Sequence, residues 1–265
     1  MKRFLLFVIL ILMFAVLGCG SGPTPNPEPT ATLVKPSDTP EPTDTPMPTD
    51  TPTPVPTSTP DAAATAAGLA TEAASVVLDE LDTLLGGSEV PYQGGHLIWQ
   101  QTEPLAIEMQ GPSGDDSILE IDDQLTARNF VFKSDVTWEA TGWMYCGAIV
   151  RSEENLKLGA QYQFYFLRFS GLPAWYIDYY DQGDYINSIS GEQFSQAIDM
   201  GNGAINQFVL VAEDEKFTVY FNGDRQGRFF DDSQRRADGI FGFMAWQESG
   251  TGSCKFENSW VWSLD

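Results

Sequence analysis

The amino-acid sequence predicts an all-β fold, an antiparallel β-sandwich, for residues 88–265. From residue 95 onward, short runs rich in aromatic and β-branched residues are separated by turns rich in Gly, Asp and Asn. Asn222-Gly223 directly follows one of these runs, and because both residues tolerate positive φ, they predict a tight hairpin turn. No long helical pattern interrupts the series, which favours two packed antiparallel sheets.

The expected strands alternate in character, as half-buried strands do. The first of them has apolar residues separated by even numbers of positions, so their side chains share one face: Phe130, Phe132, Val136 and Trp138. At roughly 178 residues, the segment is long enough for one domain with a single core. The expected strands cover residues 130–138, 143–151, 161–169, 175–180, 208–212, 217–221, 229–230, 240–246 and 254–262.

Residues 1–19 resemble a bacterial lipoprotein signal peptide. A positive start is followed by the apolar run Phe4 to Leu17, which is shorter than the ~20 residues that a membrane span needs. The run ends in the lipobox-like Val16-Leu17-Gly18-Cys19, in which the cysteine would be acylated. We therefore expect export, lipidation of Cys19 and a location in the bacterial cell envelope, facing the outside or the periplasm. An ordinary signal peptide or an uncleaved anchor helix is the alternative.

Residues 20–60 form a Pro/Thr-rich linker, because thirteen of the seventeen prolines lie between Pro23 and Pro60. Proline restricts φ and lacks an N–H donor, so this segment is expected to be disordered and extended, without a packed core. At ~3.1 Å per residue, about 40 residues reach on the order of 100 Å, enough to hold a domain away from a membrane. Its threonines are candidates for O-glycosylation.

Residues 61–87 predict a short amphipathic helix. Asp61 is a suitable N-cap for the alanine run that follows, and Gly86-Gly87 is a suitable end. The apolar stripe spans barely three turns, which favours packing against the following domain, with self-association as the alternative. The stripe consists of Leu69, Ala73, Val76, Val77, Leu81, Leu84 and Leu85.

The charge of the chain argues against a nucleic-acid partner. The formal net charge is −23, and residues 88–265 hold 27 acidic and 11 basic side chains. A field of this sign repels phosphate backbones and anionic surfaces, while it keeps an exported domain soluble.

Two cysteines remain if Cys19 carries lipid. An even pair in an exported domain, here Cys146 and Cys254, suggests a disulfide. Two buried free thiols are the alternative.

Several strand and turn motifs occur in the order of a known family. They resemble the concanavalin A-like lectin/glucanase jelly roll, in the branch of laminin-G-like and 3-keto-disaccharide hydrolase-like domains. The resemblance covers residues 128–263 and implies a jelly-roll β-sandwich whose concave sheet and rim loops hold sugars in relatives. Because the motifs mark strands and turns, they indicate a fold rather than an activity. The matching pieces are Asn129 to Phe132, Asp135 to Trp138, Cys146 to Arg151, Tyr162 to Phe166, Phe217 to Gly223, Gly239 to Phe243 and Phe256 to Trp262.

Familiar catalytic patterns are missing from the sequence. His96 is its only histidine, so neither a Ser-His-Asp device nor a histidine-rich metal site can be assembled. Glucanases of the resembled fold carry Glu-x-Asp-x-(x)-Glu, whereas here Glu120 and Asp122 are followed by Gln124, which cannot protonate a leaving group. We therefore expect no catalytic residues, with a glycan-active hydrolase as the alternative.

Sugar binding requires an aromatic platform beside hydrogen-bonding groups. In the run from Trp175 to Asp181, Trp175 and Tyr179 share one face, while Tyr176, Asp178 and Tyr180 share the other. The candidate carbohydrate-binding residues are Trp143, Tyr145, Arg151, Trp175, Tyr179, Trp246 and Glu248. For each of them, packing into the core is the alternative.

No cofactor is required by the expected function, and calcium is the ion for which the sequence offers ligands. Asp178, Asp181, Asp184 and Asn187 cluster around Gly183, and oxygen ligands on a turn suit calcium. A solvated acidic turn is the alternative.

These observations predict a surface-displayed, lipid-anchored, non-catalytic module that binds carbohydrate or another cell-envelope component. The expected partners are that component and the membrane, the latter through the lipid anchor, with possible self-association through residues 61–87. A glycan-active hydrolase and a structural or assembly lipoprotein are the alternatives.

Overall fold

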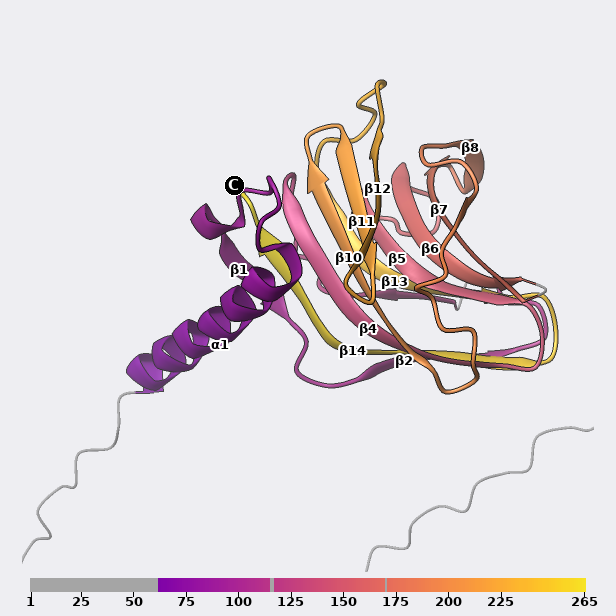
Figure 1. Cartoon of the computed structure of the whole chain (residues 1–265), viewed down its shortest axis with the longest axis horizontal. Helices are drawn as coiled ribbons and strands as arrows, with labels where there is room; N and C mark the ends of the chain where they lie inside the picture. Colours follow the sequence, from indigo (N-terminus) through magenta and orange to yellow (C-terminus); the bar gives the residue numbers. More distant parts are fainter. Residues whose placement is uncertain (1–61, 115–116, 170) are drawn as a thin grey trace, which may run out of the picture. The chain divides into compact units, whose positions relative to one another are not determined.

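The computed structural model describes residues 62–114, 117–169 and 171–265. Within them, two antiparallel β-sheets pack face to face as a jelly-roll sandwich, and one long helix precedes the sheets (Figure 1). The predicted fold class is confirmed. The signal sequence, Cys19 and the Pro/Thr-rich linker lie outside the described residues.

The chain passes back and forth between the two sheets, so that sequence neighbours often lie in different layers. Sheet A has the order β1-β14-β4-β10-β11-β12, and β2 also pairs with β14. Sheet B has the order β3-β13-β5-β6-β7-β8, and β9 also pairs with β7. The described elements are α1 (Ala62–Leu85), the 3-10 helix η1 (Tyr92–Gly94), β1 (His96–Gln100), β2 (Leu105–Gln110), β3 (Ile118–Glu120), β4 (Phe130–Ala140), β5 (Met144–Ser152), β6 (Gln161–Phe169), β7 (Leu172–Asp181), β8 (Asp184–Ser188), β9 (Gln193–Phe194), β10 (Ile205–Glu213), β11 (Lys216–Phe221), β12 (Asp224–Phe230), β13 (Ile240–Gln247) and β14 (Thr251–Ser263).

Aromatic side chains fill the space between the sheets. Phe132 of sheet A meets Phe241 and Phe243 of sheet B, with ring centroids 5.7 and 5.6 Å apart. The predicted disulfide is present: Cys146 of β5 is bonded to Cys254 of β14, with their Cα atoms 5.8 Å apart. The bond therefore joins the two sheets across the core.

The predicted hairpin is also confirmed. Phe221 and Asp224 pair at the end of β11 and β12, and Asn222 and Gly223 between them have φ values of 49° and 84°. The side-chain-free Gly223 adopts this conformation without strain, which is why the Asn-Gly pair suits the turn.

Helix α1 lies on the outer face of sheet A, away from the main core. Val77, Leu81 and Leu85 are buried there in one cluster with Trp260 and Trp262 of β14. Residues 68–72 of the helix are exposed, and Leu69 is 62% exposed. In the part of the chain that the structure describes, no helix has both the length and the apolar character to span a membrane.

Candidate functional site

The outer face of sheet B carries a row of aromatic rings, here called the aromatic face and defined as Tyr145, Tyr165, Tyr176, Tyr180 and Trp246. They come from β5, β6, β7 and β13, in which the alternate residues fill the core. All five side chains are half-buried. Strand alternation therefore directs one aromatic set inward and presents a second set to solvent.

The rings of the aromatic face lie close enough to form one surface across four strands. Tyr145 stacks on Trp246 with ring centroids 5.5 Å apart, and it lies 4.7 Å from Tyr165. Tyr165 in turn stacks on Tyr176 at 5.3 Å. Offset and stacked pairs at these distances stabilise one another, so the platform exists before any ligand arrives.

A glycine makes this close packing possible. Gly147 of β5 lies directly opposite Tyr165 of β6. A Cβ atom on Gly147 would lie 2.1 Å from the carbonyl oxygen of Phe164 and 2.7 Å from Tyr165 Cβ, closer than real contacts allow. The missing side chain lets Tyr145 and Tyr165 approach each other over the backbone at this position.

A buried carboxylate lies beside the platform. Asp178 of β7 is 3% exposed, and its Oδ2 accepts a 2.5 Å hydrogen bond from the Tyr165 hydroxyl. Its Oδ1 makes no hydrogen bond of normal geometry among the described residues. Burial raises the pKa of Asp178, while the hydroxyls of Ser188 and Tyr165 reduce the rise. Asp178 is therefore covered by the rings and holds the Tyr165 hydroxyl in place from beneath the face.

The tyrosine hydroxyls themselves remain protonated over the physiological range. Burial is the main cause that raises the pKa of Tyr165, and its hydrogen bond to Asp178 adds to the rise. Burial and the hydrogen bond to Glu192 raise the pKa of Tyr176 to about 12. The tyrosine hydroxyls on the face are therefore neutral, and they donate to the carboxyl groups of Asp178 and Glu192.

We expect Asp178→Asn to increase the free energy of unfolding at neutral pH. Because the folded-state pKa of Asp178 is raised, both states carry its proton at pH below ~3.9, whereas above that value the unfolded state ionises freely and the folded state must first keep the proton and then bury a charge, which costs stability. The gain should therefore vanish as the pH is lowered through the ordinary carboxyl range. Urea unfolding at pH 3.5 and pH 7 measures it, with the exposed Asp184→Asn as control. A variant less stable than wild type at pH 7 would contradict this prediction.

Three of the sequence-predicted sugar ligands lie in the core instead. Trp175 is 1% exposed and its ring packs against Phe221 and Phe229. Tyr179 is also buried, with the guanidinium of Arg235 4.8 Å from its ring centroid. The structure corrects these expectations because alternation identifies residues that share a face without identifying which face is covered.

Arg151 is the third of these residues. Its φ of 51° interrupts the alternation of β5, and the side chain is buried rather than aligned with Tyr145. Its guanidinium donates to the carbonyl oxygens of Arg128 and Asp214 and lies 5.1 Å from the Phe217 ring centroid. Arg151 therefore closes one edge of the sandwich and has no free donor face for a ligand.

The other predicted ligands lie on or beside the aromatic face. Tyr145 and Trp246 belong to it, and Trp143 and Glu248 meet at its end, where the Glu248 amide donates to the Trp143 carbonyl at 3.0 Å. Both of the latter side chains are exposed. Sequence reasoning missed Tyr165, Tyr176 and Tyr180 as ligands, although it placed the last two on one face with Asp178.

The expected calcium ligands have other partners or stand apart. Asp178 accepts from Tyr165, and Asn187 Oδ1 accepts from an Arg235 guanidinium nitrogen. Asp181 and Asp184 lie opposite each other in the strand register at the end of the β7–β8 hairpin. Among the described residues, no three His, Cys, Asp or Glu side chains are placed to share a metal ion. Calcium binding stays a prediction.

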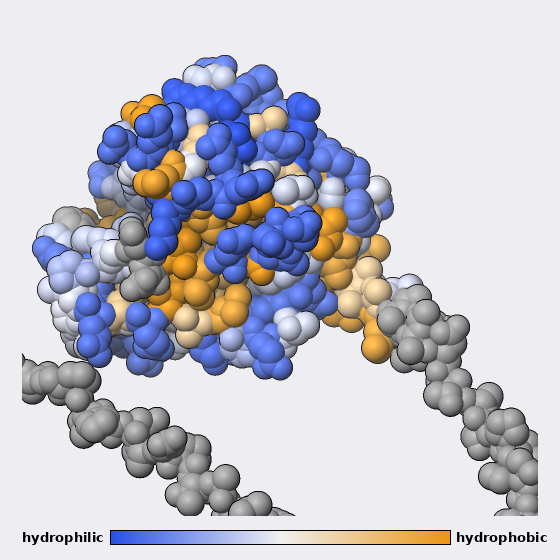
Figure 2. Space-filling view, turned by 180° about the vertical axis from the view of Figure 1, so that it is seen from behind, coloured by the Kyte–Doolittle hydropathy of each residue, from blue (hydrophilic) through white to orange (hydrophobic). Residues whose placement is uncertain are grey.

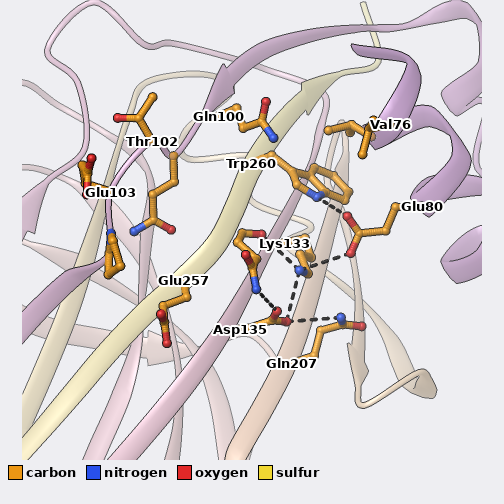
Figure 3. A pocket seen from close by; sticks show the side chains of 14 residues that line it. Val76, Glu80, Gln100, Thr102, Glu103, Lys133, Asp135, Gln207, Glu257 and Trp260 are labelled. Atoms are coloured by element: carbon orange, nitrogen blue, oxygen red, sulfur yellow. Dashed lines mark hydrogen bonds and ion pairs between the residues drawn. The ribbon is translucent and has the colours of Figure 1, made fainter. Parts of the chain in front are cut away.

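A cavity of about 400 Å³ lies on the opposite side of the molecule, between α1 and sheet A (Figure 3). Lys133 is buried there, and its Nζ donates to the Asn258 carbonyl at 3.0 Å and contacts Asp135 Oδ1 at 3.1 Å and Glu80 Oε1 at 3.2 Å. Glu80 Oε2 accepts a 2.8 Å hydrogen bond from Trp260 Nε1. These groups satisfy one another, so the cavity marks the junction that holds α1 to the sheet.

Comparisons with known proteins bear on the fold. No protein-family model and no curated protein match the chain. Among solved structures, carbohydrate-binding module CBM66 from Bacillus subtilis is 18% identical with a TM-score of 0.46, covering 63% of this chain and 94% of that chain. Sheep galectin-11 is 8% identical with a TM-score of 0.40, covering 58% and 98%. SCLam, a family GH16 endo-β-1,3(4)-glucanase, is 8% identical with a TM-score of 0.44, covering 65% and 75%. At these values the likenesses assign neither a family nor an activity.

Proposed function

We propose that this protein is a carbohydrate-binding module that receives a glycan on the aromatic face of sheet B. The observation that supports the proposal is the continuous platform of Trp246, Tyr145, Tyr165 and Tyr176, with the exposed Glu192 hydrogen-bonded to Tyr176 at its side. The C–H faces of sugar rings pack on aromatic rings, and their hydroxyls donate to carboxylates. The rings can therefore contact the apolar faces of a sugar, and Glu192 can accept hydrogen bonds from its hydroxyls.

The chemistry of the face favours binding over turnover. Hydrolysis of a glycosidic bond needs two carboxylates that flank it, about 5–9.5 Å apart. Asp178 is buried beside the rings and hydrogen-bonded to Tyr165, while Glu192 is hydrogen-bonded to Tyr176 at 2.8 Å. The two acids thus anchor the tyrosines that would carry the sugar. The glycan-active alternative would require a different carboxylate pair.

A glycan array, probed with the full chain with and without calcium, tests the proposal. Saturable retention without product release is expected, and Trp246→Ala should weaken it by about tenfold, because one aromatic contact contributes ~1.5 kcal/mol. Phe230→Ala, an exposed aromatic residue of sheet A, is the matched control and should bind as wild type.

Each other outcome of the array counts against part of the proposal. Equal retention by wild type and Trp246→Ala would place the glycan elsewhere, and released products would identify a hydrolase. Absence of retention on every glycan would favour a structural role. Loss of retention without calcium would show that binding needs the ion, against the expectation that no cofactor is required.

We further propose that the module is displayed on the bacterial surface by a lipid on Cys19. The support is the lipobox-like Val16-Leu17-Gly18-Cys19 and the Pro/Thr-rich residues 20–60, together with a disulfide in the folded domain. Disulfides persist in oxidising compartments outside the cytosol, which suits an exported domain.

A further inference from the structure

Positive side chains are scarce on this acidic chain, and many of them are already paired with acids. Arg225 of β12 is different, because it is exposed and makes no hydrogen bond or ion pair within the part of the chain that the structure describes. The ion pairs of other basic residues are Arg128 with Asp214, Lys133 with Glu80 and Asp135, Lys216 with Glu213, Arg236 with Glu153, and Lys255 with Glu257.

A β-bulge places Arg225 and Arg228 on the same side of β12. The register with β11 shifts next to Tyr220, so Arg225 lies opposite Tyr220 and Arg228 lies opposite Thr218. In a regular strand, residues three apart would face opposite sides of the sheet. The bulge brings both guanidinium groups to the outer face of sheet A, where Tyr220 is buried.

These two arginines line a cavity of about 520 Å³ beside the segment that follows α1. Tyr220 forms part of its wall, and residues 84–90 complete it. Burial raises the pKa of Tyr220, while the positive charges of Arg225 and Arg228 lower it. The two arginines therefore make this cavity a positively charged hollow on a molecule that is acidic overall. Figure 2 shows one face of the molecule by hydropathy, with hydrophilic residues around an apolar area.

One donor group of the two arginines lacks an acceptor. The Nε of Arg228 is buried and has no hydrogen-bond partner among the described residues. The one acid that reaches Arg228 is Glu89, at 3.5 Å and with a side chain that is 87% exposed. No hydrogen bond joins either arginine to the carbonyls that end α1 among the described residues, so capping of the helix does not account for the pair.

We propose that the cavity formed by Arg225, Arg228 and Tyr220 binds an oxyanion, a carboxylate or phosphate group of a ligand. A guanidinium presents a planar fork of N–H donors that matches such a group, and both arginines line the cavity. The oxyanion would displace the weakly held Glu89 from Arg228. This site lies on sheet A, so the proposal is independent of glycan binding by sheet B.

Isothermal titration calorimetry of the full chain at low salt tests this site, with inorganic phosphate and glucuronate as separate probes. At least one probe should bind, and its affinity should fall as salt is added. Arg225→Gln and Arg228→Gln should each weaken binding by about tenfold or more, since a charge-assisted hydrogen bond contributes roughly 1.5–3 kcal/mol. Arg128→Gln, which removes an exposed and already paired arginine, should bind as wild type.

The outcomes separate the sources of the anion. Binding of phosphate alone identifies a phosphorylated ligand, binding of glucuronate alone identifies an acidic sugar, and binding of both supports the shared oxyanion chemistry. If neither probe binds to wild type, or if Arg128→Gln weakens binding as much as the cavity variants do, the proposal is wrong. Arg225 is exposed and unpaired, so Arg225→Gln should fold even if Arg228→Gln does not.

Discussion

Replacing Leu81 by alanine is expected to lower the free energy of unfolding by about 2–5 kcal/mol. Leu81 is fully buried between α1 and the outer face of sheet A, in the cluster that contains Val77, Leu85, Trp260 and Trp262. The substitution leaves a cavity in this cluster but barely changes helix propensity, because alanine and leucine are both good helix formers. Urea unfolding of wild type and variant measures the loss.

Leu69→Ala is the matched control on the same helix. Leu69 is 62% exposed, so its truncation should change the free energy of unfolding by less than about 0.5 kcal/mol. Equal stability of Leu81→Ala and wild type would show that α1 does not depend on this face of the sheet. Leu69 and Val76 remain exposed, so self-association through residues 61–87 stays a prediction.

Replacing Cys19 by alanine is expected to move the protein from the membrane fraction to the soluble fraction. The substitution removes the thiol that would carry the lipid, and the apolar run Phe4 to Leu17 is shorter than the ~20 residues of a membrane span. The folded domain cannot replace the lipid by electrostatic attraction to the membrane. Residues 88–265 hold 27 acidic and 11 basic side chains, so the domain is negatively charged and an anionic membrane surface repels it. Cell fractionation with detection of the domain measures the change.

Cys146→Ala with Cys254→Ala is the appropriate control for this experiment, since it removes the other cysteines and leaves the proposed anchor in place. That variant should stay with the membrane. Continued membrane retention of Cys19→Ala would instead support an uncleaved anchor helix, which is the alternative that the sequence leaves open.

The strands were predictable because their signals are local. The alternation of Phe130, Phe132 and Val136 predicts one buried face, and the two residues Asn222-Gly223 predict a hairpin. The pairing of Cys146 with Cys254 followed from a count of cysteines in an exported domain. None of these inferences requires knowledge of a distant contact.

The candidate site was predicted only in part, because its composition depends on distant contacts. Tyr145 and Trp246 were expected as ligands. Their neighbour Tyr165 comes from another strand, and it can lie against Tyr145 only because Gly147 has no side chain. Trp175 was expected as a ligand because it begins an aromatic run that could form a platform, but Phe221 and Phe229 cover it in the core.

The sequence by itself determined the all-β class, the hairpin, the disulfide pair and the acidic charge, because each depends on composition or on residues close together in the chain. Only the tertiary structure decided which face of β7 meets solvent, which sheet α1 covers and how a bulge brings Arg225 beside Arg228. The physical reason is that periodicity states which side chains share a face, whereas burial depends on which other surface lies against that face.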